Sequence, residues 1–376
     1  MKLPPLLVQT AAALCVASTI SFTGCKHLDG EKDEKEGSAA EADKDRSKRT
    51  AAEAAFYAEC GKLAETGGTV AGRDGWLFSA AELLQLSRIR STSTATAAIA
   101  DYAQQLRSRN IDLIVVPIPP KAIIYPDKVS RGAKVPMKSR RPARLDSILK
   151  AGMDDLAARK IKVVDLTQVL IEHREDKEGT AFPRTGNTWS PYGIKFAVKE
   201  IADAVRRSNT GGRGSVTGIT AEPANLPFAG GLGTGVSGSI KPETIQTVKI
   251  GRISGDKVRS LAFNTSGGSL LLMGDENVLA WREANNPPGS TGAFCSLAEQ
   301  LAAELQIVPD VLSNSGDGRN SPRLRILRER TSGHGMLSST RTVVWVFSSL
   351  DLTSSSWQRV PLQLEFNLDS PDLQLR

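Results

Sequence analysis

The stretch that decides the fold is IDLIVVPIPP, residues 111–120, in which one acidic residue interrupts an otherwise apolar run. An Ala-rich segment, residues 94–109, precedes it and has the apolar spacing of a helix. Because the apolar side chains continue instead of alternating, both faces of the strand are expected to be buried. The stretch therefore predicts a helix that leads into a buried strand of a parallel sheet.

The same alternation of helix and strand patterns recurs along the rest of the chain. Further helices are predicted at residues 143–159, 191–207 and 295–306, and further buried strands at residues 161–166, 269–277 and 342–352. Helices that alternate with continuous apolar strands are typical of a sheet covered on both faces. The predicted fold class is α/β, a three-layer domain with a mostly parallel sheet.

Glycine, serine, threonine and proline dominate residues 208–239, which indicates a long surface excursion instead of a second core. We expect this Gly/Ser-rich insertion to extend to about residue 245. The sheet is expected to resume at the strand VKIGRI, residues 248–253.

The amino-terminal segment has the composition of an export signal. Lys2 is followed by an apolar stretch and then by FTGC, residues 22–25, so residues 1–24 are predicted to be a signal peptide and Cys25 a lipidation site. The charged residues 26–50 have almost nothing to bury and are expected to form a disordered tether. The remainder, residues 51–376, is the predicted domain of a membrane-anchored lipoprotein that faces the periplasm or the cell surface, with the choice of membrane left open.

Charge and cysteine content narrow the ligand classes. The net charge is +7, but the basic residues are scattered without interleaved aromatic residues, so an acidic polysaccharide or anionic lipid is a better expected partner than nucleic acid. No Cys/His spacing fits zinc, and the Gly-rich tract lacks the arrangement of a phosphate-binding loop, so neither a metal nor a cofactor is predicted. Whether Cys60 and Cys295 form a disulfide is left open.

Several motifs, taken in order, resemble one family. They are GRDGWLF (residues 72–78), VPIPPKAIIYPDKV (116–129), TWSPYG (188–193), LLLMGDEN (270–277), SLAEQLAAEL (296–305) and VVWVF (343–347). Together they resemble the SGNH-hydrolase-like proteins of alginate O-acetylation, the AlgX/AlgJ type, over residues 72–361. The resemblance implies an SGNH or flavodoxin-like fold with permuted motif order and a role in extracytoplasmic polysaccharide biosynthesis or O-acetylation.

The family's catalytic residues are not carried by this sequence. Its proteins are known for transferring an acetyl group to mannuronate hydroxyls through a serine nucleophile, a histidine base and an aspartate that orients the histidine. The motifs place Gly186 at the aspartate, Thr188 at the histidine and Glu276 at the serine, with Trp189 and Gly274 fixing the register. A serine needs a base to become a good nucleophile, so these substitutions argue against acyl transfer.

Four other residues are candidates for a cleft or ligand site. Asp275, with Asn277 two residues later, follows a buried strand, where a carboxylate commonly holds the turn by bonding backbone amides; ligand contact is its second interpretation. Lys121, in the Pro-Pro-Lys turn, is either a contact for a carboxylated sugar or a solvated lysine. Trp281 is the best candidate for a ring that faces a ligand.

Three functions remain open on these observations. The favoured hypothesis is a non-catalytic member that binds acidic polysaccharide or an acetylation-machinery protein through the triad cleft, which we define as the cleft expected between the strand ends near Pro119, Thr188 and Gly274. The second is an acyltransferase or esterase that uses Glu276, Cys295 or His334 in a non-standard site. The third is a structural envelope lipoprotein. The other two histidines, His27 and His173, are interpreted as solvent-exposed bystanders.

Overall fold

The computed structural model describes residues 50–208, 218–235, 242–255, 257–265, 268–282, 294–331 and 335–362. All of them belong to one compact unit that begins at Arg49. The lipidation site Cys25, the signal peptide, the tether, His27 and His334 lie outside the described residues. Within the described ranges, no helix combines the length and the apolar character needed to cross a bilayer.

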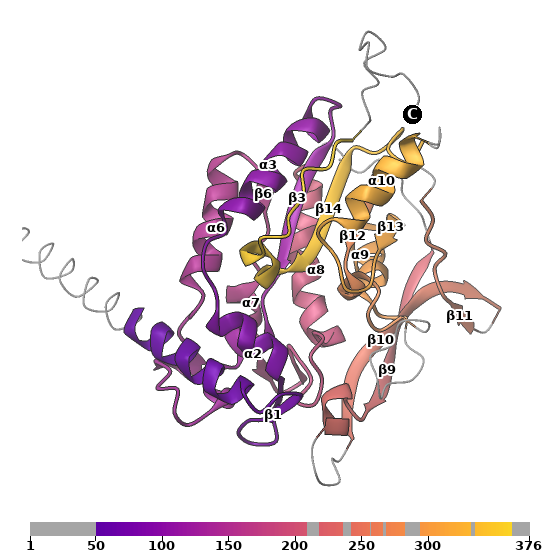
Figure 1. Cartoon of the computed structure of the whole chain (residues 1–376). Coiled ribbons are helices and arrows are strands. Elements are labelled where there is room, and N and C mark those ends of the chain that lie inside the picture. Colours follow the sequence, from indigo (N-terminus) through magenta and orange to yellow (C-terminus); the bar gives the residue numbers. More distant parts are fainter. Residues whose placement is uncertain are drawn as a thin grey trace, which may run out of the picture. The chain divides into compact units, whose positions relative to one another are not determined.

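A five-stranded parallel sheet forms the centre of the unit (Figure 1). Its strand order is β13 (Asp310–Ser313), β12 (Leu270–Gly274), β14 (Thr342–Ser348), β3 (Asp112–Ile118) and β6 (Lys162–Val163). Every pair of neighbouring strands is parallel. All five residues of β12 are buried, as the continuous apolar run predicts. The predicted α/β class and parallel sheet are confirmed.

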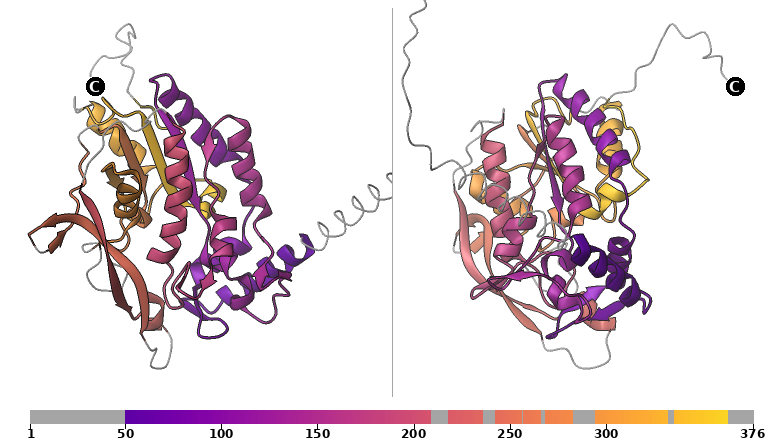
Figure 2. Two further views of the ribbon diagram at one scale, coloured as in Figure 1. Left: turned by 180° about the vertical axis from the view of Figure 1, so that it is seen from behind. Right: turned by 90° about the vertical axis from the view of Figure 1, so that its left-hand side faces the viewer.

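Helices cover both faces of this sheet. They are α3 (Ser93–Arg107), α6 (Ser147–Ala158), α8 (Pro191–Arg206), α9 (Leu297–Leu305) and α10 (Ser321–Thr331). Connections between parallel strands are right-handed, so the direction of each connection decides which face its helix covers. The connections β3–α6–β6 and β13–α10–β14 run toward the β6 edge of the sheet and place α6 and α10 on one face. The connections β6–α8–β12 and β12–α9–β13 run toward the β13 edge and place α8 and α9 on the other face. Accordingly α3 packs on α6, α8 packs on α9, and Figure 2 shows α3 and α8 on opposite faces.

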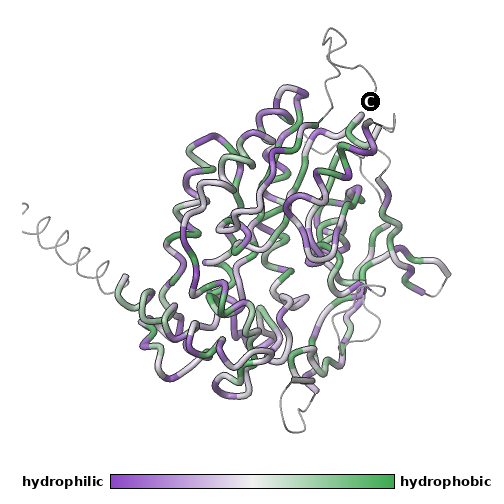
Figure 3. The backbone as a smooth tube through the Cα atoms, in the orientation of Figure 1, coloured by the Kyte–Doolittle hydropathy of each residue, from purple (hydrophilic) through white to green (hydrophobic). Residues whose placement is uncertain are grey.

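The interior is continuous and rich in aromatic side chains. Figure 3 shows apolar residues along the central strands and polar residues along the outer sides of the helices. Trp189 and Trp345 are both completely buried in this interior. Arg323 is also fully buried, with its guanidinium over the rings of Trp345 and Trp357 at 5.1 and 5.4 Å.

One predicted strand lies elsewhere than expected. The segment VKIGRI is part of β10 (Glu243–Ser254), which pairs antiparallel with β9 (Ile219–Phe228) and with β11 (Lys257–Arg259) in a separate three-stranded sheet. Only a minority of β10 residues are buried, so this strand cannot be central to the parallel sheet. The expectation that the parallel sheet resumes at residue 248 is therefore wrong. The described part of the Gly/Ser-rich insertion forms the first arm of a long hairpin beside α8 and α9.

Short elements connect these layers. A helix spans residues 50–64, and the other elements are β1 (Thr69–Ala71), β2 (Leu77–Ser79), α2 (Ala80–Ser87), α4 (Lys121–Ile124), α5 (Pro126–Val129), β4 (Met137–Lys138), β5 (Arg141–Pro142), α7 (Thr167–Glu172), β7 (Glu175–Asp176), β8 (Gly179–Thr180), η1 (Gly231–Gly235), η2 (Glu276–Val278) and η4 (Ser349–Thr353). The segment between β8 and α8 and the turn that becomes η2 carry the triad positions.

Candidate functional site

The structure brings together the segments that were predicted to form the triad cleft. The Trp281 indole Nε1 donates a hydrogen bond to the Trp189 carbonyl oxygen at 2.7 Å, which joins the η2 turn to the segment before α8. The Lys121 ammonium donates to the Gly186 carbonyl oxygen at 2.8 Å, which joins the end of β3 to the same segment. At two of the positions that the resemblance gives to the triad, Thr188 is half-buried and Glu276 is exposed.

A phenylalanine fills the space beside Gly186. A Cβ atom added to Gly186 would lie 2.7 Å from Cζ and 2.9 Å from Cε1 of Phe228, the last residue of β9. The Phe228 ring is 1% exposed and packs against Trp281 with ring centroids 5.2 Å apart. The position that the family resemblance gives to the orienting aspartate therefore has no room for a carboxylate. Sequence reasoning missed Phe228 because it lies in the Gly/Ser-rich insertion and belongs to no motif.

The turn after β12 is held by its own carboxylates. The Asp275 side chain is buried, and its Oδ1 accepts a hydrogen bond from the Asn277 backbone N–H at 2.9 Å. This confirms the turn-holding interpretation of Asp275 and places Asn277 as its partner. The Glu276 Oε2 accepts a hydrogen bond from the Gly316 N–H at 2.7 Å, so this side chain is bound to the loop after β13.

We expect Asp275→Asn to remove part of a pH dependence of stability. Burial, and then the nearby Glu276 carboxylate, raise the pKa of Asp275 from 3.8 to about 7. Between these values the folded state binds a proton that the unfolded state lacks, so this contribution to stability is present at low pH and is lost as the pH rises through 7. The difference in unfolding free energy between pH 5 and pH 8, measured by urea titration, should shift by at least about 1.4 kcal/mol, the equivalent of one pKa unit.

Asp317→Asn is the matched control with the opposite sign. Hydrogen bonds from Ser321 and nearby backbone amides outweigh desolvation and lower the pKa of Asp317. Its contribution is therefore present above the ordinary aspartate pKa and is lost as the pH falls. An Asp275→Asn protein with the same pH profile as the natural chain would contradict the assignment of a buried, partly protonated carboxyl.

The carboxyl ends of the central strands carry an excess of negative charge. Asp275 and Glu276 follow β12, Asp317 follows β13 and Asp351 follows β14. Burial raises the pKa of Asp351 to about 6, with Arg319 acting in the opposite direction. Arg319 is the basic partner here, 3.3 Å from Asp317 and 3.7 Å from Asp351. No cluster of His, Cys, Asp and Glu in the part of the chain that the structure describes has an arrangement that would hold a metal ion.

Lys121 is not a ligand contact. Its side chain is fully buried, and its Nζ donates to the carbonyl oxygens of Leu77, Arg184 and Gly186 at 2.7, 2.8 and 2.8 Å. The ammonium also lies 5.1 Å from the ring centroid of Trp76. Both interpretations made from the sequence, a sugar contact and a solvated lysine, are wrong, because folding surrounds the ammonium with backbone acceptors.

Opposing effects act on the charge of Lys121. Burial lowers the pKa of Lys121 to about 7, and the nearby carboxylates of Glu82 and Glu243 act in the opposite direction. An ammonium has three N–H donors, and all three are used here, so this hydrogen-bonding pattern requires the protonated form. The adjacent Glu82 has its own pKa raised to about 7 by burial. We therefore assign Lys121 a structural role, in which its ammonium joins α4 to β2 and to the segment before α8.

Trp281 does not face a ligand. The residue is completely buried and has a left-handed backbone conformation (φ 72°), which residues other than glycine rarely adopt. Its ring lies against Phe228, and its indole N–H is used by the Trp189 carbonyl group. The prediction of a ligand-facing ring is wrong because the hairpin arm that carries Phe228, which the sequence did not place, covers this tryptophan.

The remaining nucleophile candidates are not activated. Cys60 and Cys295 are both free and buried, so they form no disulfide with each other. Burial raises the pKa of the Cys295 thiol to about 12, which opposes the stabilisation of a thiolate expected at a helix start.

His173 is not a solvated bystander, because its Nδ1 lies 2.7 Å from the Asp176 Oδ2 and its ring stacks on Phe196 at 3.6 Å between centroids.

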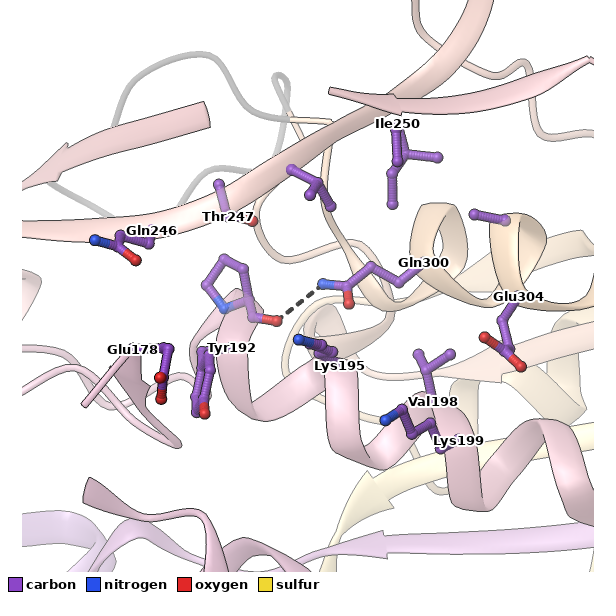
Figure 4. Close-up of a pocket in the computed structure, with 14 residues that line it drawn as sticks. Glu178, Tyr192, Lys195, Val198, Lys199, Gln246, Thr247, Ile250, Gln300 and Glu304 are labelled. Carbon is purple, nitrogen blue, oxygen red and sulfur yellow. Dashed lines mark hydrogen bonds between the residues drawn. The ribbon is translucent and has the colours of Figure 1, made fainter. Parts of the chain in front are cut away.

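Two adjoining cavities lie beside the hairpin, and we call them together the hairpin groove. The first, about 520 Å³, is lined by α8, α9, β9 and β10 (Figure 4). The second, about 310 Å³, is lined by the β7–β8 turn, the segment before α8, and β10. Glu178, Tyr192 and Gln246 line both cavities, so the two are continuous. None of the three triad positions lines this groove.

Comparison with known proteins supports the sequence resemblance. The probable alginate O-acetylase AlgJ of Pseudomonas aeruginosa is 28% identical over 144 residues, which cover 38% of this chain and 34% of that protein. The protein of the same name from Pseudomonas putida is 26% identical over 166 residues, 44% of this chain and 41% of that protein. The matched region thus spans less than half the length of these relatives.

Solved structures show the same fold. The O-acetyltransferase domain of Pseudomonas putida AlgJ superposes with a TM-score of 0.57 at 19% identity, covering 77% of this chain and 96% of that chain. Pseudomonas aeruginosa AlgX superposes with a TM-score of 0.56 at 16% identity, covering 79% and 66%. The expected SGNH-like fold is confirmed. A family model described as "SGNH hydrolase-like domain, acetyltransferase AlgX" matches residues 69–348, and the chain therefore belongs to this family.

Proposed function

We propose that this chain is a catalytically inactive member of its family that serves polysaccharide O-acetylation by binding, as a scaffold for an alginate-like polysaccharide or for an acetylation protein. Membership of the family supports the pathway, and the AlgJ relatives are named for alginate O-acetylation. We also propose that the chain is exported and carries a lipid anchor on Cys25. The signal-like composition of the amino-terminal residues supports this part of the proposal.

The loss of acyl transfer rests above all on Phe228. A missing nucleophile alone would leave a cleft into which another side chain might reach, but this ring occupies the space beside Gly186. The triad position at Glu276 carries a carboxylate bound to a backbone amide, and Thr188 has no titratable group to act as a base. Fold similarity does not restore an absent triad.

The alternative, an active enzyme with a non-standard site, would need a nucleophile with an activating partner. Glu276 is the strongest candidate because it is exposed at a strand end and a carboxylate can attack an acyl group. Its hydrogen bond to Gly316 and the nearby Asp275 and Asp351 leave it among acids instead of beside a base.

Acetyl-ester hydrolysis by the purified chain tests this proposal. We expect turnover of 4-nitrophenyl acetate to stay at the buffer rate and to be unchanged in Glu276→Ala, because loss of a complete serine triad costs on the order of 10⁶ in kcat. A natural chain that hydrolyses the ester, with activity abolished by Glu276→Ala, would show that an enzyme with a new site is correct. Measurement in parallel with an active AlgJ domain provides the positive control.

A further inference from the structure

We propose that the hairpin groove binds a carboxylated oligosaccharide. This deepens the proposed function, on which it rests for the class of ligand, and it moves the binding site away from the triad cleft. The groove lies between α8 and the hairpin, and its lining residues come from segments separated by more than a hundred residues along the chain.

Unpaired cations stand on the rim of the groove. Lys195 and Lys199 lie one turn apart on α8, are both exposed, and make no ion pair within the described ranges. Their ammonium groups are 5.9 and 5.6 Å from the Phe196 ring centroid. Lys177 and Arg184 line the other cavity, and neither the Lys177 ammonium nor the Arg184 guanidinium makes an ion pair within the described ranges. These cations mark both ends of the groove.

Four carboxylates also line the groove, and one of them, that of Glu304, is paired with an arginine. Asp176 accepts a hydrogen bond from a tyrosine hydroxyl at 2.7 Å, and Glu243 accepts two from backbone amides at 3.1 and 3.2 Å. Glu304 lies 2.7 Å from an α8 arginine. Glu178 is the one lining carboxylate without such a partner in the described part of the chain. A hydrogen bond from a neutral group leaves a carboxylate charged, so the groove presents four cations against three carboxylates that have no Lys or Arg ion pair among the described residues.

The walls between these charges suit a sugar. Figure 4 shows Tyr192, Lys195 and Lys199 of α8 across the cavity from Gln246 and Thr247 of β10, with α9 closing one side. Exposed amide and hydroxyl groups can bond sugar hydroxyls, and a half-buried tyrosine ring offers a face for sugar C–H groups.

One side of the groove is prepared by the fold. The Gln300 Nε2 donates to the carbonyl oxygens of Pro191 and Cys295 at 3.1 and 2.9 Å, which fixes the amide in place before any ligand arrives. Val198 and Ile250 supply an apolar floor. A mostly apolar cavity with a few fixed polar groups is the usual form of a small-ligand site.

Charge distinguishes this groove from the triad cleft. The strand ends at the triad cleft carry Asp275, Glu276, Asp317 and Asp351 around one arginine, and a carboxylated chain would be repelled there. The hairpin groove instead carries four cations against three carboxylates that have no Lys or Arg ion pair among the described residues. Electrostatics therefore favours the groove over the cleft that the family resemblance points to.

Calorimetric titration of the full chain in detergent tests the proposal, with three probes at low ionic strength. An oligomannuronate supplies carboxylates on sugar rings, a cello-oligosaccharide supplies sugar without charge, and polyglutamate supplies charge without sugar. We expect oligomannuronate alone to bind. The double variant Lys195→Gln and Lys199→Gln should weaken this binding about five- to tenfold, since two exposed charge contacts are lost.

A second double variant controls for net charge. Lys150→Gln in α6 and Arg159→Gln directly after it remove two exposed cations, each of which is paired with a carboxylate one helical turn away.

If both double variants weakened binding equally, or if the α8 double variant left binding unchanged, the groove would not be the binding site, although the chain would still bind polysaccharide. Equal binding of polyglutamate would overturn the sugar class. If the natural chain did not bind oligomannuronate, both the polysaccharide-binding function and the groove as its site would be contradicted. Whether the chain is an enzyme is tested separately, by the ester assay.

Discussion

Replacement of Lys121 by methionine should lower the free energy of unfolding by at least about 2 kcal/mol, because each buried acceptor left without a donor costs about 1–3 kcal/mol. The Arg184 carbonyl oxygen also accepts a hydrogen bond from the Leu77 N–H at 2.9 Å, so the carbonyl oxygens of Leu77 and Gly186 are the two that lose their donor. Methionine retains a long apolar side chain, so the loss reports the charge and its hydrogen bonds instead of a cavity. Urea unfolding at pH 7 measures it.

Lys128→Met is the control for this experiment. Lys128 lies in α5, a few residues further along, and its Nζ is 2.9 Å from the Oδ2 of the exposed Asp74 and 3.6 Å from the Oε1 of Glu175. Surface ion pairs contribute about 0–1 kcal/mol each, so the control should lose less stability than Lys121→Met. If Lys121→Met were equally stable and instead lost glycan binding, the interpretation of Lys121 as a ligand contact would have to be restored.

Gly186→Ala should destabilise the protein by about 1–3 kcal/mol, the usual cost of forcing an extra group into a packed interior. The added methyl group would lie 2.7 Å from Phe228 Cζ, and that ring is held between the hairpin and Trp281. The same substitution in a Phe228→Leu background should cost close to nothing, because leucine lacks the ring atoms that collide. Unfolding free energies of the two single variants and the double variant complete the cycle.

This cycle also bears on the evolution of the site. A coupling energy near zero between Gly186 and Phe228 would mean that the ring moves aside without cost, and the argument for a blocked aspartate position would fail. A coupling of 1 kcal/mol or more would mean that Gly186→Asp, Thr188→His and Glu276→Ser cannot rebuild a triad unless Phe228 is replaced as well.

The parallel sheet and its helices were predictable because their pattern is local. The apolar runs that became β3, β12 and β14 have continuous hydrophobic character, and the helices at α8 and α9 begin with recognisable capping residues. The turn role of Asp275 followed from its place after a strand. The substitution of the triad positions, inferred from motif order and two residues that set the register, stays a prediction.

The error at residues 248–253 has a physical cause. A short run such as VKIGRI satisfies the pattern of a strand in either sheet, and pairing between strands depends on which backbone edge is free to bond. In the structure β9 provides this free edge. Residues 243–252 of β10 pair with β9, and residues 252–254 pair with β11.

By itself the sequence determined the α/β class, the parallel sheet and the family, because these depend on periodicity and on residue identity at motif positions. Only the tertiary structure decided what became of the side chains around the triad positions. Lys121 and Trp281 were expected to be accessible and are buried, and Phe228 was not expected at all. Burial of a single side chain is set by what the rest of the chain brings to it from a distance, and here a hairpin arm about forty residues away supplies the ring that closes the space.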